Sequence, residues 1–460
     1  KAPGDGVTGG SLNGAGVLVI ETERVGRDAV LMQMMRLVEE AQAGKAPIAR
    51  LADVVSGYFV PAVLVIGCVA AGGWLLAGES LAFALQVFVA VLIIACPCSL
   101  GLATPAAIMV GTGRGAQLGI LVKSPEALEA AHKLDVVILD KTGTITEGRP
   151  FFVEMSALNG HEQDDVLRYA AAVEKGSEHP LSMAVLARAE ACGIEVPHAE
   201  GFEALPGKGA RAEVGGVVVA VGNRAMMTAV GVDFEDGGFL SPDAVGGTIV
   251  WVSIAGLLAG HLVLADRIRP ESRNDVAQLR ARGLDIVMLT GDRRAVAEKV
   301  AHEVGIETMY AEVLPGDKAA VVQSLQQEDT RVAMVGDGIN DAPALATADV
   351  GIAVATGTDV AVESADLVLV HNRLIDVVRS IELSQAVMRT IRQNLFWAFF
   401  YNAAGIPVAA GVLYLFGGPL LNPILASFAM AFSSVSVVAN ALRLRSFSPH
   451  SERSMDNESS

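Results

Sequence analysis

Hydrophobic residues gather in four long runs, which form two pairs separated by a long mixed region. The runs at 58–77, 83–110, 395–416 and 421–442 are each long enough to cross about 30 Å of hydrocarbon as a helix. The turns within each pair contain no Lys or Arg, whereas the outer flanks carry Lys45, Arg50, Arg114, Lys123, Arg389, Arg392, Arg443 and Arg445. By the positive-inside rule, both termini and the central region then face the cytoplasm. The pattern predicts four membrane helices in two hairpins, in a multi-pass protein of a bacterial plasma membrane.

Shorter hydrophobic runs recur in the region between the pairs. The runs at 136–139, 286–289 and 332–335 each end abruptly in polar residues, which is typical of buried strands of a parallel sheet. The polar residues that follow them are Asp140, Thr290 with Asp292, and Asp337 with Asp341. Because the carboxyl ends of parallel strands meet at one edge, these side chains should come together there. A turn or a helix cap would explain any one of the three, but not all of them.

These patterns divide the chain into domains. Residues 112–148 and 263–375 both contain apolar strands that are followed directly by polar residues with a carboxylate, and they are predicted to form one parallel-sheet domain. Residues 149–262 contain glycine-rich, strand-like stretches and are predicted to be a domain inserted into it. The other parts are an N-terminal segment at 1–50, helical hairpins at 51–111 and 376–445, and a polar tail at 446–460.

Composition narrows the possible classes of protein. A length of 460 residues suggests two or three domains. A hydrophobic content of 52% with only 18% charged residues is high for a soluble protein and agrees with membrane helices. The net charge of −17 argues against a nucleic-acid partner. Four cysteines, two of them in one hydrophobic run, do not form the framework of a disulfide-rich secreted domain.

The first of the strand ends carries the most distinctive chemistry. A carboxylate at Asp140 can bind Mg2+ as a hard oxygen ligand, or it can attack phosphorus and become an aspartyl phosphate. Lys141 offers a positive charge for phosphate oxygens, and residues 142–144 offer hydroxyls and approachable backbone N–H groups. This edge of the sheet is therefore predicted to carry out phosphoryl transfer.

Three motifs resemble the signature set of the P-type ATPases: D-K-T-G-T at 140–144, T-G-D at 290–292 and G-D-G-I-N-D at 336–341. The resemblance implies a membrane α-helical bundle and an α/β haloacid-dehalogenase-like (Rossmann-like) phosphorylation domain with an inserted α+β nucleotide-binding domain. It implies that ATP phosphorylates Asp140 and that Asp337 and Asp341 hold Mg2+. The other catalytic residues that it implies are Lys141, Thr142, Thr144, Thr290, Gly291, Asp292 and Lys318.

The predicted insert carries residues that suit a nucleotide. The S-E-H-P sequence at 177–180 places a carboxylate and an imidazole beside a helix start, and the glycines of P-G-K-G at 206–209 allow a planar ligand to approach. Taken alone, a capping histidine and a plain turn would explain both. Together they resemble the nucleotide-binding domain of the heavy-metal subfamily, although Ala212 stands where that subfamily often has a further glycine. The adenosine contacts that the resemblance implies are Glu174, Glu178, His179, Gly207, Gly209 and Asn223.

Cys96, Pro97 and Cys98 lie near the middle of the second long run. A proline there deprives nearby carbonyls of helical partners, which a membrane tolerates only where the backbone faces protein or a polar cavity. Thiolates at such a break favour Cu(I) and also accept Zn2+, whereas two small packing cysteines at a kink are the simpler alternative. No Lys, Arg, Asp or Glu lies inside the four runs, which suits a soft monovalent ion better than Zn2+.

Cys-Pro-Cys, with Tyr-Asn in the third run and Met-x-x-Ser-Ser in the fourth, resembles the Cu(I)-exporting branch of the heavy-metal P-type ATPases. The resemblance implies a transport site for Cu(I), or for Ag(I), formed by Cys96, Cys98, Tyr401, Asn402, Met430 and Ser433. A metallochaperone and the lipid bilayer are the partners expected beside ATP and the ion.

Residues 1–50 resemble the last part of an actuator domain, whose Thr-Gly-Glu loop would precede Lys1. The Thr8-Gly9-Gly10 sequence lacks the carboxylate and does not replace that loop. The chain is therefore expected to be a Cu(I) pump without its N-terminal portion. The alternatives are a Zn2+/Cd2+ pump, a phosphatase that its helices merely tether to a membrane, and an incomplete pump fragment that binds nucleotide or a partner.

Overall fold

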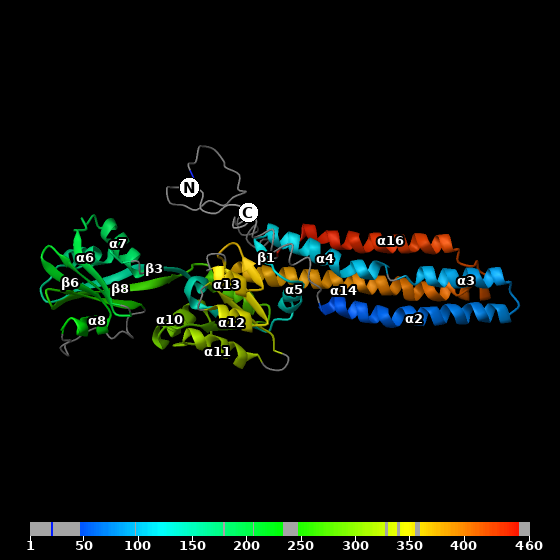
Figure 1. The fold of residues 1–460 in the computed structure, drawn as a ribbon, viewed down its shortest axis with the longest axis horizontal. Coiled ribbons are helices and arrows are strands. Elements are labelled where there is room, and N and C mark those ends of the chain that lie inside the picture. Colours follow the sequence, from blue (N-terminus) through cyan, green and yellow to red (C-terminus); the bar gives the residue numbers. More distant parts are fainter. Residues whose placement is uncertain are drawn as a thin grey trace.

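The computed structural model describes residues 20–21, 47–96, 98–177, 180–205, 207–232, 247–326, 330–337, 341–354 and 359–449. These residues form three parts that follow one another along a line: an outer sheet domain, a central sheet domain and a long helical bundle (Figure 1). The expected actuator segment lies almost entirely outside the described residues, and so does the tail from residue 450 onward.

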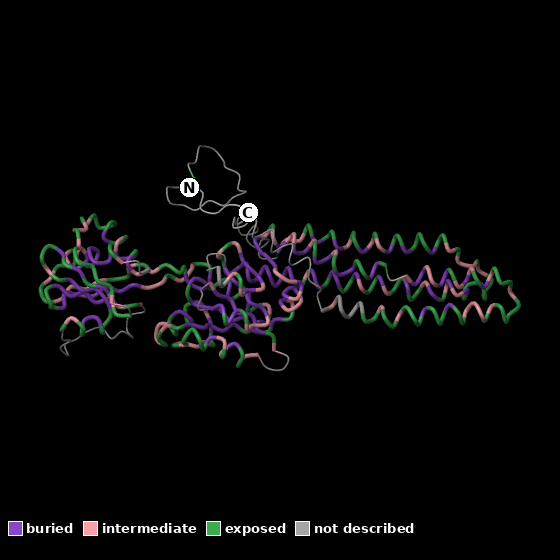
Figure 2. The backbone as a smooth tube through the Cα atoms, in the orientation of Figure 1, coloured by how far each residue is buried: buried purple, intermediate pink, exposed green. Residues whose placement is uncertain are grey.

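The helical bundle contains the segments predicted to enter a membrane. Its helices are α2 (Pro47–Leu76), α3 (Leu81–Ile94), α4 (Cys98–Gln117), the second half of α14 (Ile375–Ala409), α15 (Val412–Leu415) and α16 (Pro423–Leu442), followed by the 3-10 turn η5 (Arg443–Ser446). Within the described chain, three stretches are long and apolar enough to cross a membrane: Val54–Leu76, Leu81–Gln117 and Pro423–Ser446. The outer face of the bundle is exposed along its length (Figure 2). It includes apolar residues such as Val65 and Phe432, as expected of a surface that faces lipid.

Two of the predicted membrane segments differ from the observed helices. The second, 83–110, is two helices, because α3 ends at Ile94 and α4 begins at Cys98; Pro97 itself lies outside the described residues. The third, 395–416, is not one separate helix, because its first part continues α14 and the chain turns at Gly411, where φ is +93°. Because α14 ends at Ala409, its last 18 residues include Arg392, Gln393 and Asn394, and this part is not among the three stretches named above.

The central domain is a seven-stranded sheet in the order β1-β13-β12-β11-β2-β9-β10. Its strands are β1 (Ile120–Val122), β2 (Val136–Asp140), β9 (Asp285–Leu289), β10 (Thr308–Tyr310), β11 (Val332–Gly336), β12 (Val350–Val354) and β13 (Leu367–Leu369). All neighbours pair in parallel except β1 with β13. The three strands predicted from the sequence are therefore adjacent, with β2 between β11 and β9. Their carboxyl ends lie at one edge, as predicted.

Both faces of this sheet are covered, which explains why its strands are continuous hydrophobic runs rather than alternating ones. Val137 and Leu139 of β2 enter the core on one face, whereas Val136 and Ile138 enter the core on the other. The covering helices are α5 (Pro125–Ala131), α9 (Ser272–Arg280), α10 (Arg294–Val304), α11 (Lys318–Leu325) with the 3-10 turn η3 (Pro315–Asp317), α12 (Ala342–Thr347), α13 (Asp359–Ser364) and the first half of α14.

The outer domain is an antiparallel six-stranded sheet in the order β3-β8-β7-β6-β5-β4. Its strands are β3 (Thr146–Ala157), β4 (Ala199–Leu205), β5 (Gly209–Val214), β6 (Val217–Gly222), β7 (Thr248–Ile254) and β8 (Leu257–Ile268), and its helices are α6 (Gln163–Glu174), α7 (Pro180–Ala191) and α8 (Arg224–Ala229). Strands β3 and β8 pair as a ribbon that leads back to the central domain (Figure 1). The predicted boundaries at 148/149 and 262/263 therefore fall inside two continuous strands.

Helix α14 joins the central domain to the bundle without a break, and α4 packs closely against it. At Gly111 of α4, a Cβ atom would lie 2.4 Å from Cγ2 of Val387 in α14. At Gly113, two residues further along the same helix, a Cβ atom would meet nothing within 4 Å. The contact between the two helices therefore depends on the missing side chain at position 111.

We predict that Gly111→Val destabilises the junction by about 1–3 kcal/mol, because the added methyl groups must displace Val387 or separate the two helices. Gly113→Val is the matched control, since it adds the same side chain to the same helix in open space. The midpoint of thermal unfolding in detergent should fall clearly for the first variant and little for the second. Equal midpoints would contradict the close packing of α4 against α14.

Candidate functional site

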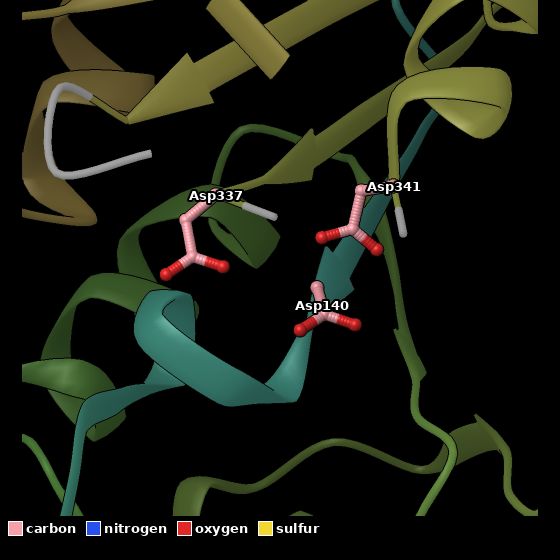
Figure 3. Close-up of side chains that lie close together, drawn as sticks. All are labelled: Asp140, Asp337 and Asp341. Carbon is pink, nitrogen blue, oxygen red and sulfur yellow. The ribbon is translucent and has the colours of Figure 1, made fainter. Parts of the chain in front are cut away.

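Three carboxylates meet at the carboxyl edge of the central sheet. Asp140 is the last residue of β2, Asp337 follows β11 and Asp341 precedes α12. One oxygen from each lies within 4.8 Å of the others, and Figure 3 shows the three side chains facing one shared space. The pairing of β2 with β11 brings these residues together although some 200 residues of sequence separate them. The structure thus assembles the predicted cluster.

Lys318 bridges two of these carboxylates from the start of α11. Its Nζ lies 2.6 Å from Oδ1 of Asp140 and 2.6 Å from Oδ1 of Asp341, and all three side chains are buried. Burial by itself would lower the pKa of Lys318, but the two carboxylates outweigh it and raise that pKa. One buried ammonium group therefore offsets part of a concentrated negative charge.

The carboxyl groups themselves respond to that concentration of charge. Burial raises the pKa of Asp140 to about 7; the charge of Asp341 adds to the rise and Lys318 opposes it. Burial, followed by the charge of Asp341, raises the pKa of Asp337 to about 6. Crowded carboxylate oxygens with only one cation beside them form a donor set that fits Mg2+, whose charge would relieve their mutual repulsion.

The turn after β2 holds Asp140 in a defined orientation. It is a single irregular helical turn, η2 (Lys141–Ile145), in which the Thr142 N–H donates to Oδ2 of Asp140 at 2.8 Å. Gly143 has φ of +72°, and a Cβ atom there would lie only 1.6 Å from Oδ2 of Asp337. Only glycine lets the turn pass so close to a second carboxylate. The predicted residue Thr144 is buried, and its hydroxyl has no partner among the described residues.

The remaining predicted catalytic residues close one side of this space. Lys141 forms an ion pair with Asp292, which follows β9. Thr290 is buried, and its hydroxyl accepts a hydrogen bond from the Asp292 N–H at 3.1 Å. At Gly291 a Cβ atom would come within 3.3 Å of the Val313 carbonyl oxygen, so a side chain would be crowded. The motif residues at 338–340 lie outside the described part of the chain.

Three residues at and after the end of β8 anchor this turn and are not among the predicted site residues. The guanidinium of Arg269 donates to the carbonyls of Thr146 at 2.9 Å and Gly143 at 3.1 Å, and Asp266 is hydrogen-bonded to the Thr146 hydroxyl. Ser272 donates to the Ile145 carbonyl at 2.7 Å. The available signal is the polar sequence that begins at Asp266, because it ends the apolar run of β8 as abruptly as Asp140 ends that of β2.

The predicted nucleotide residues fall into two groups. Asn223 caps α8 through a hydrogen bond to the Met226 N–H, and its Nδ2 donates to the Gly207 carbonyl at 2.8 Å. Gly209 begins β5, where a Cβ atom would lie 2.1 Å from the Val221 carbonyl oxygen. These three residues lie together around the β5–β6 hairpin.

Glu174 ends α6 and is largely buried. Its burial raises the pKa of its carboxyl group, against a hydrogen bond with Ser177. Glu178 and His179 lie outside the described residues, so their predicted contacts with adenosine stay predictions.

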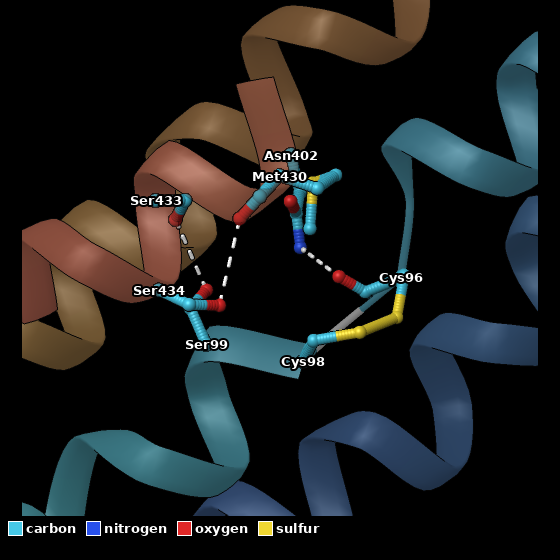
Figure 4. The surroundings of a disulfide bond; sticks show 7 residues. All are labelled: Cys96, Cys98, Ser99, Asn402, Met430, Ser433 and Ser434. Carbon is cyan, nitrogen blue, oxygen red and sulfur yellow. Dashed lines mark hydrogen bonds between the residues drawn. A yellow bond between two sulfur atoms is a disulfide. The ribbon is translucent and has the colours of Figure 1, made fainter. Parts of the chain in front are cut away.

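The break between α3 and α4 brings together most of the predicted membrane site. Asn402 of α14 donates from Nδ2 to the Cys96 carbonyl at 3.5 Å (Figure 4). Met430 of α16 is buried in the cluster that Cys96 packs against. Ser433 donates to the hydroxyl of Ser99 at 3.1 Å. Asn402 Oδ1 is buried without a partner among the described residues, so an oxygen acceptor is left free beside the break.

Two features of the membrane site differ from the prediction. Cys96 and Cys98 form a disulfide, so neither supplies a thiolate in this form (Figure 4). Tyr401 lies outside the cluster: it is 43% exposed and packs against the rings of Trp397 and Phe400. Successive residues of a helix point about 100° apart, so Asn402 can face the break only if Tyr401 turns away from it.

Comparisons with known proteins agree with this geometry. A family model described as haloacid dehalogenase-like hydrolase matches residues 134–349. The crystal structure of a zinc-transporting PIB-type ATPase in its E2.Pi state is 34% identical, superposes with a TM-score of 0.72, and aligns over 91% of this chain and 68% of its own. The chain belongs to the P-type ATPases.

Curated P-type ATPases are closer still in sequence. The probable copper-transporting ATPase PacS of Synechococcus elongatus is 50% identical over 457 residues, which make up 98% of this chain and 60% of that protein. The silver exporting P-type ATPase of Salmonella typhimurium is 47% identical over 97% of this chain and 55% of its own length. The chain therefore spans 60% and 55% of the lengths of these two P-type ATPases.

The raised pKa of Asp140 predicts a pH-dependent stability. In the folded state this carboxyl binds its proton more tightly than in the unfolded state, where its pKa is about 4, so the ionised form costs stability above pH 7. Without divalent cations, Asp140→Asn should stabilise the chain at pH 8 by about 2–4 kcal/mol. The gain should shrink as the pH falls through 7 and vanish near pH 4.

Urea unfolding in detergent with EDTA, at a series of pH values, measures this difference. Asp285→Asn is the matched control, because Asp285 is an exposed aspartate at the start of the neighbouring strand β9. Its effect should be small and nearly independent of pH. If Asp140→Asn is less stable than the wild type at pH 8, the attraction of Lys318 for the ionised carboxylate outweighs the cost of its burial and of the repulsion by Asp341.

Proposed function

We propose that this chain is the catalytic and ion-conducting part of an ATP-driven pump that exports Cu(I), or Ag(I), through an aspartyl phosphate. The observation that carries the proposal is that one continuous helix joins two sites, one suited to phosphoryl transfer and one suited to a soft metal ion. A buried carboxylate nucleophile stands at a sheet edge, and a helix break with sulfur, amide and hydroxyl groups stands in the bundle. Helix α14 runs continuously from the central domain to that break and contributes Asn402 to it.

Asp140 is the nucleophile of the proposed reaction. One of its carboxylate oxygens attacks the γ-phosphorus of ATP, the bond to the β-phosphate oxygen breaks, and ADP leaves with the electron pair of that bond. Asp337, Asp341 and Asp140 would hold Mg2+, which supplies charge neutralisation for the phosphate oxygens. The Thr142 N–H, whose nitrogen lies 2.8 Å from Oδ2, fixes the rotation of the carboxylate, and Oδ1 is then the oxygen that would attack.

Lys318 has to change partners during this step. In the structure its ammonium group is bound to Oδ1 of Asp140, the oxygen that would attack. Moving this group from Oδ1 to an incoming phosphate oxygen frees the nucleophile and places the cation where negative charge develops. Lys141 directly follows Asp140 and is paired with Asp292 beyond the neighbouring strand β9, and it offers a second positive charge to the phosphoryl group.

At the break in the bundle, the proposed ligands suit a soft monovalent ion. Reduction of the Cys96–Cys98 disulfide would provide two thiolates, beside the Met430 thioether and the unpartnered Oδ1 of Asn402. Within the described parts of α3, α4, α14 and α16, no carboxylate is hydrogen-bonded to this group. Tyr401 is not part of the proposed site.

A zinc pump is the second candidate, and the similarity to a zinc-transporting structure is the observation that favours it. Zn2+ is held in proteins by Cys, His and carboxylate groups, whereas this site sets a Met430 thioether, a soft donor that suits Cu(I), beside its two cysteines. The curated relatives named above are described as copper-transporting and silver exporting, which supports the monovalent ion. The same phosphorylation assay separates the two candidates.

We predict that Cu(I) under reducing conditions stimulates acid-stable labelling of the chain by [γ-32P]ATP in membranes. Asp140→Asn should abolish labelling, because it removes the nucleophile. Cys96→Ser/Cys98→Ser should remove at least about nine-tenths of the Cu(I)-stimulated part, since soft-metal affinity depends on the thiolates. Without reductant, the wild type should behave like this double variant because the disulfide offers no thiolate.

Cys68→Ser/Cys192→Ser is the matched control, since it removes the two exposed cysteines and leaves the break intact. It should keep full Cu(I)-stimulated labelling. Stimulation by Zn2+ rather than Cu(I) would favour the zinc pump. Labelling that needs Asp140 but ignores metals and all four cysteines would indicate a membrane-tethered phosphatase.

A further inference from the structure

A cavity of about 420 Å³ lies where the helical bundle meets the central domain, away from both sites described above. Two arginines, Arg389 and Arg392, line it from α14, and His132 lines it from the end of α5. At its other end lie Phe396 and Trp397, also of α14. Positions 385, 389, 392 and 396 recur at helical spacing, so one face of α14 lines the cavity from its polar to its aromatic end, opposite His132.

The positive charge in this cavity has no carboxylate paired with it in the part of the chain that the structure describes. Within the described residues, neither Arg389 nor Arg392 forms an ion pair with a carboxylate. The nearby Glu129 is engaged by Lys133 at 3.7 Å and by the Ile48 N–H at 2.9 Å. The two neighbouring guanidinium groups on one helix face therefore repel each other, and an anion bound between them would offset that repulsion.

His132 holds one of the arginines in place. Its Nδ1–H donates to the Glu129 carbonyl, which leaves Nε2 as the acceptor for an Arg392 NH2 group at 3.0 Å. Burial lowers the pKa of His132 and the charge of Arg392 adds to this, which agrees with a neutral ring that accepts this bond. Arg392 spends one donor on this bond, and its remaining N–H groups stay available to a ligand.

The aromatic end of the cavity continues onto the outside of the bundle. Phe396, Trp397 and Phe400 are 60%, 47% and 48% exposed, and their rings contact one another. Aromatic residues collect at the level of lipid headgroups, with cations on the cytoplasmic side. A free phosphate would use only the arginines, whereas a lipid would use the arginines and this apolar surface together.

We propose that this cavity binds the headgroup of an anionic glycerophospholipid from the cytoplasmic leaflet. The phosphodiester lies between Arg389 and Arg392, and the acyl chains extend along Phe396, Trp397 and Phe400. The proposal goes beyond the pumping function and needs only that α14 enters the membrane. In this proposal, the helix that links the two proposed sites contacts an anionic lipid, so the lipid composition of the bilayer can affect it.

Quenching of Trp397 fluorescence by brominated lipids tests this directly. The chain has three tryptophans, so Trp74→Phe/Trp251→Phe leaves Trp397 alone at the cavity. Reconstituted in vesicles of phosphatidylcholine, this variant is titrated with brominated phosphatidylglycerol or with brominated phosphatidylcholine. Phosphatidylglycerol should reach half-quenching at a mole fraction at least about fivefold lower, which corresponds to the attraction of about one cation at the surface.

Arg389→Gln/Arg392→Gln should bring the two lipids to equal quenching. Arg443→Gln/Arg445→Gln is the matched control, since it removes two exposed arginines after α16 that do not line the cavity, and it should keep the preference. A variant that retains Trp74 instead of Trp397 reports on the far end of the bundle and should show no preference, which also confirms that the chain is inserted.

Three results would overturn the proposal. Equal quenching by both lipids in the single-tryptophan variant would show that the cavity does not select an anionic headgroup. Equal losses in the two arginine pairs would show a general effect of surface charge. Displacement of the brominated lipid by inorganic phosphate would show that the arginines form a site for a free anion.

Discussion

The crowding of three carboxylates around one buried ammonium group is the constraint on which the central domain depends. Parallel strands deliver Asp140, Asp337 and Asp341 to one point, where their repulsion opposes the burial of the strands that carry them. Lys318 reduces that repulsion but leaves a net negative charge. The remaining negative charge raises the pKa values of Asp140 and Asp337, and it would favour the binding of a cation at this point.

The groups at the break between α3 and α4 differ from the carboxylate cluster, because they are neutral and have few hydrogen-bond partners among the described residues. Among the described residues, Oδ1 of Asn402 has no partner, and the Ser433 hydroxyl donates to Ser99 of the facing helix. Neutral amide and hydroxyl groups beside sulfur differ in this way from the carboxylate oxygens that hard ions prefer, and the donors that the two cysteines offer depend on their redox state. Helix α14 connects the two sites, since one end packs in the core of the central domain and the other places Asn402 at the break.

The fold and the carboxylate cluster could be predicted from the sequence, because a parallel sheet brings the residues that follow three separate strands to one edge. Apolar runs specify strands buried on both faces, and the residue after each run can only lie at the edge. The insert boundaries could not be predicted, because β3 and β8 continue through them without a change of composition. Tyr401 could not be separated from Asn402 either, since a membrane helix is apolar on all sides and its hydropathy does not reveal which face meets another helix.

The ribbon of β3 and β8 has a mechanical consequence for the nucleotide-binding domain. Two paired strands resist stretching, so the domain stays at a fixed reach of about 40 Å for 12 extended residues. A ribbon bends most easily where its ladder is interrupted, and the pairing of β3 with β8 shifts register between Thr146 and Pro150 and again between Phe152 and Glu154. A bend at the first of these shifts would swing the outer domain along an arc about the end of β3 that is nearest to Asp140.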